Sequence, residues 1–474
     1  MVSGMRKRLL LLVVLGSVLA VSSANAQILG RKTFARYSAN TSHVLVVTNA
    51  TDYVNGSVKS PAALRKKPGR DGISLREAVF AARSGTTITF ARKLATRTIY
   101  LTLPLTLKRP GVTIAGIGDS SPAPKIRGDL YITAADVTIR GLDLNMIRAE
   151  NSPLGGAPLT VQASHGQDVR SVLIEGNALD ALGNNHSLDV RANDGGKIEG
   201  LVIARNTFTN PLQDAINVAL IGEGSVVDGL TVSDNMMTDV GAIGVEIFGF
   251  GAKNTRLSNT TISGNIFRNS SLAVGEAGVS ITWFGLGGGN TDNLVEHTTI
   301  SGNVIAGYGE SCLQLGVSDD APDTGNTVRD TEVVNNFCSG GLFVGNSSTN
   351  SVDDLRIVND TIMGTHGDLR RAVGLDIRNT ILGVEILGVS VDQVRNSIVV
   401  TGPGFLGVKP GFAGVNGNLA ADPLFVDPAH GDFHLRPGSP AIDAGTSDGA
   451  PTTDLDGHPR SDGHPDIGAY EFVR

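Results

Sequence analysis

The chain has 474 residues, of which 60 are glycine and 18% are charged. This composition is too apolar for a disordered chain and too rich in glycine for an array of helices. The charge is uneven, because residues 27–140 carry 18 basic and 6 acidic side chains, whereas residues 141–474 carry 18 and 40. So acidic a body argues against nucleic acid as a partner, whereas the basic segment could be attracted to an anionic wall or polymer.

The first residues have the pattern of a secretory signal peptide. Three basic residues, 6–8, precede an apolar stretch from Leu9 to Val21, and Ala24-Asn25-Ala26 fits cleavage before Gln27. The apolar stretch is short for a membrane anchor, and no later segment is long and apolar enough to cross a bilayer. We therefore expect a secreted, periplasmic or cell-surface protein without a membrane span after cleavage.

The N-terminal part of the mature chain predicts a cap for a larger structure. Residues 44–49 are typical of a strand and a turn, and Ser74 with Glu77 forms a capping box that begins a short helix ending by Gly85. We expect the basic cluster of Arg65, Lys66, Lys67 and Arg70 to be a solvated loop. Further strands are predicted at residues 87–90, 98–101, 112–114 and 137–139.

One motif recurs along the middle of the chain: isoleucine or valine, two further residues, then asparagine. A strand-rich repeat of this length indicates a solenoid, in which stacked coils bury one continuous apolar core. We expect each asparagine to adopt the left-handed conformation at a sharp corner and to bond to the amides above and below. Beyond Asn336 the motif weakens through Asn359, Asn379 and Asn396. The main asparagines are Asn177, Asn206, Asn235, Asn265, Asn303 and Asn336.

A second series of strands lies between these motifs, at residues 188–190, 216–218, 245–247, 279–281 and 313–315. Alternation places the first and third residues of each strand inside and the middle residue outside. Stacking would then align the middle residues in one exposed column, about 4.8 Å per coil. These residues are Asp189, Asn217, Glu246, Ser280 and Gln314.

The chain has two cysteines, Cys312 and Cys338. Cys338 follows Asn336 by two residues, the place held by Phe267 and Ile305 in earlier repeats, so we expect it to point into the core. Cys312 is expected to precede a strand. Export permits a disulfide, but two unpaired thiols are the simpler interpretation.

Several segments resemble known bacterial surface proteins. The repeats resemble right-handed parallel β-helix proteins of the pectate-lyase-like superfamily. Residues 73–78 resemble the motif that names the CSLREA family, with Ile73 in place of its cysteine. Residues 421–425, 438–445 and 466–471 resemble the end of choice-of-anchor Q β-helix proteins. The resemblance implies a carbohydrate-related role but transfers no catalytic residue, and without an apolar tail after Glu471 we expect release rather than anchoring.

Three acidic residues are the catalytic candidates. Glycosidases use two carboxyl groups, which in inverting enzymes lie about 6.5–9.5 Å apart. Asp189 and Glu246 are two coils apart in the column, or about 9.6 Å. Asp214 stands just before the intervening strand, as Glu276 and Glu310 do before later ones. Ordinary polar residues on a solvated sheet would give the same pattern, and this remains the simpler interpretation.

The candidate carbohydrate-binding residues are Arg191, Asn217, Gln314, Phe248 and Trp283. Aromatic rings can stack on sugars, although alternation points Trp283 inward or into a loop. Arg191 is also the best candidate base for a calcium-dependent lyase, but so acidic a body would repel a polyanion unless metal were bound. We assign no metal ligand and no certain cofactor, with calcium the one kept open, and we interpret the C-terminal aspartates as turn residues.

We therefore expect an all-β chain, a right-handed parallel β-helix with a short N-terminal capping helix and an irregular C-terminal cap. Its expected parts are a signal peptide (1–26), an N-terminal cap with the first coils (27–110), the β-helix (111–401) and the C-terminal cap (402–474). We expect a monomer that binds or cleaves extracellular carbohydrate. The alternatives are a non-catalytic adhesion or matrix protein and a calcium-dependent polysaccharide lyase.

Overall fold

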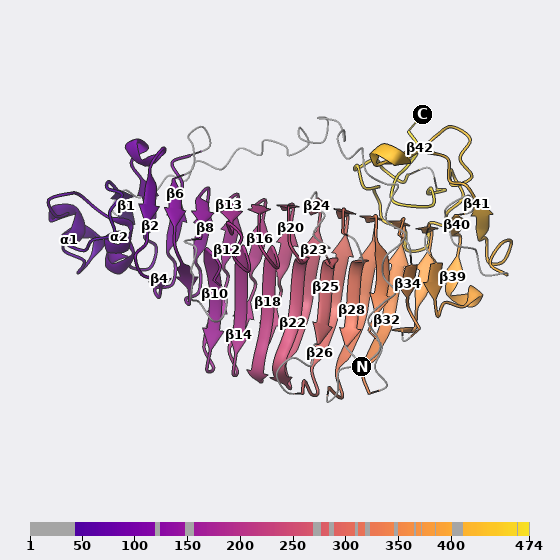
Figure 1. Ribbon diagram of the computed structural model, residues 1–474, viewed down its shortest axis with the longest axis horizontal. Coiled ribbons are helices and arrows are strands. Elements are labelled where there is room, and N and C mark those ends of the chain that lie inside the picture. Colours follow the sequence, from indigo (N-terminus) through magenta and orange to yellow (C-terminus); the bar gives the residue numbers. More distant parts are fainter. Residues whose placement is uncertain are drawn as a thin grey trace, which may run out of the picture.

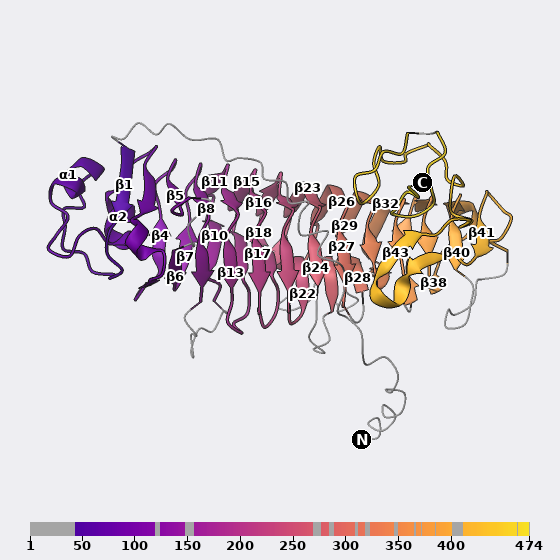
Figure 2. The ribbon, with the colours of Figure 1, turned by 90° about the horizontal axis from the view of Figure 1, so that it is seen from above.

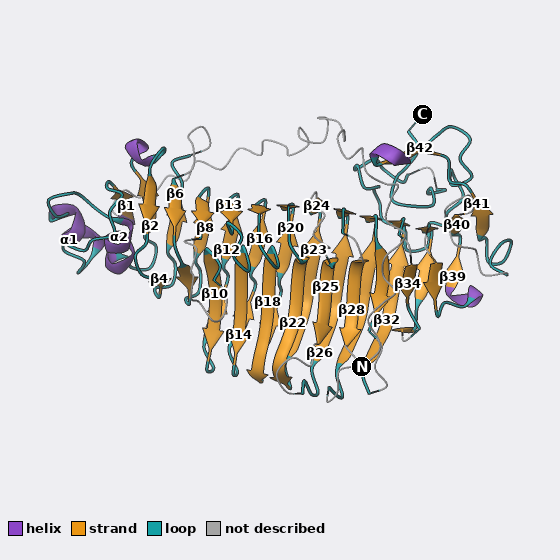
Figure 3. Cartoon of the chain, viewed as in Figure 1, coloured by secondary structure: helices purple, strands orange, loops and turns teal. Residues whose placement is uncertain are grey.

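The computed structural model describes residues 43–473 except 119–123, 147–155, 269–275, 284–288, 309–310, 318–322, 346–348, 365, 371, 384, 401–410 and 462. The expected signal peptide therefore lies outside the described residues. The described chain forms one long rod of stacked coils (Figure 1) in which nearly all regular structure is strand (Figure 3). The predicted fold class, an all-β parallel β-helix, is confirmed.

Three parallel sheets run along the described rod, and each regular coil passes through sheet C, then sheet A, then sheet B. Sheet C contains β4 (Leu105–Leu107), β7 (Leu130–Ile132), β10 (Leu159–Ser164), β14 (Leu188–Asn193), β18 (Ile216–Glu223), β22 (Ile243–Lys253), β25 (Ala277–Trp283), β28 (Ser311–Val317), β31 (Gly341–Val344), β34 (His366–Asp368) and β38 (Glu385–Leu387). Sheet B contains β3 (Thr98–Tyr100), β6 (Lys125–Arg127), β9 (Asp143–Asn145), β13 (Ala178–Asp180), β17 (Thr207–Thr209), β21 (Met236–Thr238), β24 (Ile266–Arg268), β27 (Val304–Ala306), β30 (Phe337–Cys338), β33 (Thr361–Ile362), β37 (Ile381–Leu382), β40 (Ile398–Val400) and β41 (Leu419–Ala421).

Sheet A begins as two short ladders of strands that merge at β23. It contains β1 (Val44–Val47), β2 (Thr87–Phe90), β5 (Thr113–Ala115), β8 (Thr138–Arg140), β11 (Asp168–Arg170), β12 (Leu173–Glu175), β15 (Lys197–Glu199), β16 (Val202–Ala204), β19 (Val226–Asp228), β20 (Thr231–Ser233), β23 (Arg256–Ser263), β26 (Leu294–Ser301), β29 (Thr327–Val334), β32 (Ser351–Val358), β35 (Ala372–Val373), β36 (Asp376–Arg378) and β39 (Val394–Arg395). The remaining elements are the helices α1 (Pro61–Lys66) and α2 (Leu75–Ala81), the short 3₁₀ turns Arg92–Leu94, Val391–Gln393 and Pro428–His430, and the antiparallel pair β42 (Phe425–Asp427) and β43 (Asp432–Leu435).

Equivalent residues of successive coils lie directly above one another. In sheet A, Ile174 pairs with Ile203, Ile203 with Val232, and Val232 with Ile262, and all four side chains are fully buried. Each such burial contributes about 1.5–3 kcal/mol relative to an exposed side chain. The coils therefore share one continuous core, as the repeat predicts.

The recurring asparagines form a hydrogen-bonded chain, here called the asparagine ladder, which runs from Asn177 to Asn336. The backbone N–H and the Nδ2 of Asn206 both donate to Oδ1 of Asn235, at 2.8 and 3.1 Å. Asn235 repeats the pattern toward Asn265 at 3.0 Å for both bonds, and its Nδ2 also donates to the carbonyl of Ile203 at 2.9 Å. The predicted amide-to-amide bonding is confirmed, and it satisfies polar groups that each corner buries.

The left-handed conformation, however, lies one residue before the ladder. Gly176, Arg205 and Asp234 have φ of 61°, 55° and 54°, and the asparagines that follow them do not have positive φ. The prediction that the ladder asparagines are themselves left-handed is therefore wrong. The side chain of each must point inward to reach the next coil, so the residue before it makes the turn.

The same offset explains why the motif weakens beyond Asn336. Asn359, Asn379 and Asn396 are the left-handed corner residues, with φ of 55°, 48° and 46°. The next ladder position belongs to Asp360, whose Oδ1 accepts hydrogen bonds from the backbone N–H and Nδ2 of Asn336 at 2.7 and 2.8 Å. Burial raises the pKa of Asp360 to about 7, which permits a neutral side chain in the ladder.

Replacing a central ladder residue tests this account. Asn235→Ala removes one acceptor for two donors of Asn206 and the donor to Ile203, and each polar group left buried and unpaired is costly. We expect a loss of about 2–4 kcal/mol in the free energy of unfolding, measured with urea. Asn185→Ala is the control, because Asn185 is also an asparagine but is half-buried and lies outside the ladder. Equal stability of the two variants would contradict the role of the ladder.

The N-terminal end is closed by α1 and α2 (Figure 1). The capping box is confirmed, since the Ser74 side chain accepts from the N–H of Glu77 and the Glu77 side chain accepts from the N–H of Ser74. The loop expected around Arg65 is partly wrong, because α1 includes Arg65 and Lys66, with Ser60 as N-cap. The basic side chains of this segment are nevertheless exposed, as expected.

The C-terminal region, residues 422–473, packs against the flank of the last coils (Figures 1 and 2). Nδ2 of Asn335, Asn359 and Asn379 donates to the carbonyls of Thr453, Asp466 and Thr446, at 3.2, 3.0 and 2.7 Å. The corner residues of three coils therefore hold the region that we expected to cover the end of the stack. β41 pairs with β40 beyond residue 401, so the segment expected to be cap also contributes the last strand of sheet B. The expected domain limits otherwise stay predictions.

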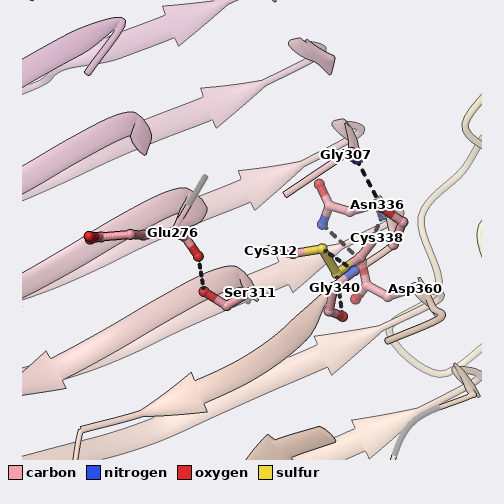
Figure 4. Close-up of a disulfide and its surroundings, with 9 residues drawn as sticks. Glu276, Gly307, Ser311, Cys312, Asn336, Cys338, Gly340 and Asp360 are labelled. Carbon is pink, nitrogen blue, oxygen red and sulfur yellow. Dashed lines mark hydrogen bonds between the residues drawn. A yellow bond between two sulfur atoms is a disulfide. The ribbon is translucent and has the colours of Figure 1, made fainter. Parts of the chain in front are cut away.

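Cys312 and Cys338 form a disulfide with their Cα atoms 5.8 Å apart (Figure 4). Cys338 lies in the core in register with Ile305, as predicted. The favoured interpretation of two unpaired thiols is wrong, because Cys312 is the second residue of β28 rather than a residue before it. The bridge therefore joins β28 of sheet C to β30 of sheet B at the corner between the two sheets.

Removing the disulfide tests its contribution to stability. A bridge that closes a 26-residue separation is expected to contribute about 3 kcal/mol, mainly by restricting the unfolded chain. The double variant Cys312→Ala/Cys338→Ala should lose that amount in urea unfolding, and reductant should no longer change its stability. Two titratable thiols in the unfolded, unreduced wild-type protein would contradict the bridge.

Candidate functional site on sheet C

The predicted column of middle residues exists in the predicted register. Asp189 pairs with Asn217, Asn217 with Glu246, Glu246 with Ser280, and Ser280 with Gln314. The column continues toward the N-terminal end through Thr160 and Tyr131. Sheet C therefore carries one line of polar side chains across five coils and beyond.

The expected exposure of this column is largely wrong. Asp189, Asn217 and Ser280 are 1%, 4% and 0% exposed, whereas Glu246 and Gln314 are partly exposed. The small side chains are covered by longer neighbours, with Arg191 folding over Asp189. Access to the column is therefore concentrated near Glu246.

Asp189 has partners that neutralise its charge. Its Oδ2 forms an ion pair with Arg191, and its Oδ1 accepts a hydrogen bond from Nδ2 of Asn217 at 3.1 Å. A buried carboxylate needs such partners to remain ionised. Three of the predicted site residues are therefore joined in one small network, in which Asp189 holds Arg191 in place.

Glu246 instead lies against Asp214, the third catalytic candidate. Oδ1 of Asp214 accepts a hydrogen bond from the N–H of Ile243 at 3.1 Å, and Oδ2 lies 3.1 Å from Nδ1 of His186. His186 and Asp214 are 8% and 3% exposed. A partly exposed glutamate thus adjoins a buried aspartate–histidine pair.

This environment strongly favours the protonated form of Glu246. Burial raises the pKa of Glu246, and the adjoining carboxylate of Asp214 raises it further through charge and hydrogen bonding, to about 9. The exposed Glu276 adds a smaller effect of the same sign. Two carboxyl groups in contact cannot both ionise readily, so the pair favours the protonated form of Glu246 over the ionised form.

Tyr308 lies in the core and is affected by the charge of Asp214. It is 3% exposed, its ring packs edge-on against Phe267 with centroids 6.4 Å apart, and its hydroxyl has no hydrogen-bond partner among the described residues. Burial raises the pKa of Tyr308, and the charge of Asp214 adds to the shift. Tyr308 is therefore a buried core residue close enough to Asp214 to be affected by its charge.

Aromatic side chains flank the polar column on sheet C. Phe248 is half-buried and Phe250 is 42% exposed, and both follow Glu246 on β22. Trp283 pairs with Gly249, but its side chain lies outside the described residues, as does Glu310. The described rings offer a partly apolar surface beside the acid pair.

The described parts of the chain contain no group of three or more His, Cys, Asp or Glu side chains placed to hold a metal ion. Among the same residues, no helix has the length and apolar character needed to cross a membrane.

Comparison with family models gives no match, and comparison with curated proteins gives none either. Solved structures do share the architecture. Pectate lyase Pel9A is 14% identical, covers 91% of this chain and 98% of its own, and has a TM-score of 0.42. XylC in complex with xylose is 10% identical with the same coverages and a TM-score of 0.44. An alginate lyase from Paenibacillus sp. is 13% identical, covers 74% and 97%, and has a TM-score of 0.34. At these identities the likeness concerns the fold alone.

The sequence pairs Asp189 with Glu246, whereas the structure places Asp214, the third predicted candidate, beside Glu246. Asp189 and Glu246 are two coils apart, whereas Asp214 contacts Glu246 directly. His186 was missed, although it stands two residues before β14 just as Asp214 stands two residues before β18. The shared offset places both at the corner that leads into sheet C.

The raised pKa of Glu246 gives a prediction for stability. An acid whose folded pKa of about 9 exceeds its unfolded value destabilises the fold progressively as pH rises from about 4.5 to about 9. Glutamine does not ionise, so Glu246→Gln should remove this pH-dependent destabilisation. Relative to wild type, the free energy of unfolding of the variant should rise by roughly 1–3 kcal/mol between pH 5 and pH 9, as measured with urea.

Glu199→Gln is the matched control, because Glu199 is also partly exposed but lies on β15 in sheet A. A difference from wild type that does not change with pH in the Glu246→Gln variant would contradict the assignment. Asp214→Asn should reduce the pH-dependent destabilisation caused by Glu246 without abolishing it, because it removes the adjoining charge but leaves Glu246 buried.

Proposed function

We propose that this chain binds and hydrolyses an extracellular polysaccharide on the outer face of sheet C, with Glu246 as the general acid. The observation that carries the proposal is the contact between Glu246 and Asp214, which keeps a partly exposed carboxyl group protonated at neutral pH. The surrounding column of polar side chains and the rings of Phe248 and Phe250 support a sugar chain as the ligand.

The proposed reaction begins with proton transfer from Glu246 to the glycosidic oxygen as the bond from that oxygen to the anomeric carbon breaks. A water molecule adds to the anomeric carbon and gives up its proton to an ionised carboxylate at the site. Exposed Glu276 is better suited to receive that proton than Asp189, which is buried and paired with Arg191. Asp189 and Asn217 then serve to position Arg191 beside the substrate.

Carbohydrate binding without turnover is the second candidate. It is favoured by the neutralisation of Asp189, because Arg191 and Asn217 pair with this carboxylate and it is not free to act together with Glu246. Such a protein would use the same face for adhesion. The disulfide fits either role, since stable disulfides form in oxidising compartments outside the cytoplasm.

One series of assays distinguishes hydrolysis from binding without turnover. Purified protein is offered neutral and uronate-containing polysaccharides, with binding, new reducing ends and unsaturated products measured on each. For a hydrolase we expect reducing ends without unsaturated products. Glu246→Gln should lower the rate by about 10²–10⁴-fold with little change in binding, whereas Glu199→Gln should leave it unchanged.

The pH profile supplies an independent check. Activity should fall as pH rises through about 9, where Glu246 loses its proton. Asp214→Asn should move that fall to lower pH. Full activity in Glu246→Gln would contradict the general-acid role, and binding without products would favour the adhesion candidate. Absence of both binding and turnover on every glycan would contradict a carbohydrate ligand.

A further inference from the structure

The N-terminal end of the rod carries a second surface that the candidate site does not use. Six of the fifteen exposed large hydrophobic side chains in the described part of the chain lie between residues 46 and 103. Four of them form what we call the N-terminal patch. They are Tyr53, Val54, Phe80 and Leu103, which are 74%, 45%, 47% and 68% exposed.

One buried ion pair, between Arg76 and Asp52, holds together the segments that carry this patch. Arg76 donates to both oxygens of Asp52 at 2.8 Å, and Oδ2 of Asp52 also accepts from the N–H and hydroxyl of Thr102 at 2.8 Å. Tyr53 follows Asp52 and Leu103 follows Thr102, while the guanidinium of Arg76 lies 6.0 Å from the ring centre of Phe80. Segments far apart in sequence therefore present their apolar side chains together.

Exposed cations lie on the same segments of the chain as the patch residues. Arg83 lies just beyond α2 and donates to the carbonyl of Lys59, and the carbonyl of Lys67 accepts from the N–H of Ser57, three residues after Val54. Across residues 43–118, exposed lysine and arginine side chains number eleven, against one exposed acidic residue, Asp71. The exposed cations are Lys59, Arg65, Lys66, Lys67, Arg70, Arg83, Arg92, Lys93, Arg97, Lys108 and Arg109.

We propose that the N-terminal patch docks on an anionic lipid surface. Val54 and Leu103 are aliphatic, so they can enter the apolar boundary of a bilayer but cannot stack on a sugar ring. The exposed lysines and arginines of this end match the charge of anionic headgroups, each contributing about a fivefold gain in affinity. Docking of a second copy end to end would place two basic surfaces in contact, which charge repulsion opposes.

The position of the patch at one extremity of the rod (Figures 1 and 2) determines the orientation of the docked protein. The body beyond residue 140 is strongly acidic and would be repelled by the same headgroups. The rod would therefore contact the membrane by its N-terminal end, with the acid pair of sheet C kept away from the lipid.

The test is co-sedimentation of the full chain with vesicles of phosphatidylcholine, either pure or with about a third phosphatidylglycerol. We expect binding to the anionic vesicles alone, weakened at least about tenfold when salt rises from about 50 to about 300 mM. Lys59→Gln/Arg83→Gln/Lys108→Gln should weaken binding about 100-fold. Phe80→Ser/Leu103→Ser should weaken it about tenfold or more, since both side chains are exposed and can change without unfolding the chain.

The control variant is Lys197→Gln/Lys253→Gln/Arg268→Gln, which removes three exposed cations from the body instead. It should bind as wild type does. The proposal is overturned by failure to bind the anionic vesicles or by equal effects of the two triple variants. It is also overturned if Phe80→Ser/Leu103→Ser binds normally and soluble dextran sulfate competes, because the basic surface would then recognise a polyanion rather than a lipid.

Discussion

In-register hydrogen bonding between successive coils is the constraint on which this molecule depends. A parallel β-helix buries a corner in every coil, and each corner leaves polar backbone groups without partners inside the apolar core. The asparagine ladder satisfies those groups with one side chain per coil, because an amide can donate and accept at once. Asn235 bonds to the ladder asparagines of both neighbouring coils. A shift of its coil by one residue along the strand direction would break both sets of bonds, so the ladder also fixes the register.

That register creates the candidate site from residues that are ordinary one at a time. Glu246 and Asp214 belong to neighbouring coils and are 32 positions apart in the chain. Stacking brings their carboxyl groups together, and this contact, together with burial, raises the pKa of Glu246. Asp189 occupies an equivalent place on β14, but Arg191 and Asn217 neutralise it. The chemistry of each column position is thus decided by its immediate neighbours rather than by its place in the repeat.

Periodicity was sufficient to predict the fold, the polar column and its register, because these follow from alternation and repeat length. It could not predict how exposed the side chains of the column are, because Asp189 is buried by the long side chain of Arg191, which forms an ion pair with it. It also misplaced the left-handed corners by one residue, because asparagine is common both at corners and in the ladder, as Asn335 and Asn336 show side by side. The disulfide and the contacts of the C-terminal region join elements whose distances no local pattern encodes.

The attachment of the C-terminal region has a consequence for how the chain matures. Arg460 is buried against Glu471 and donates to Oδ1 of Asn335, a residue 125 positions earlier. A chain synthesised from its N-terminus cannot form these contacts until its last residues are available. Until then, one flank of the coils near Asn335 stays uncovered. Completion of the rod is then a late event, and chains ending before Asp454 should be cut at these coils by a protease that spares the full-length protein.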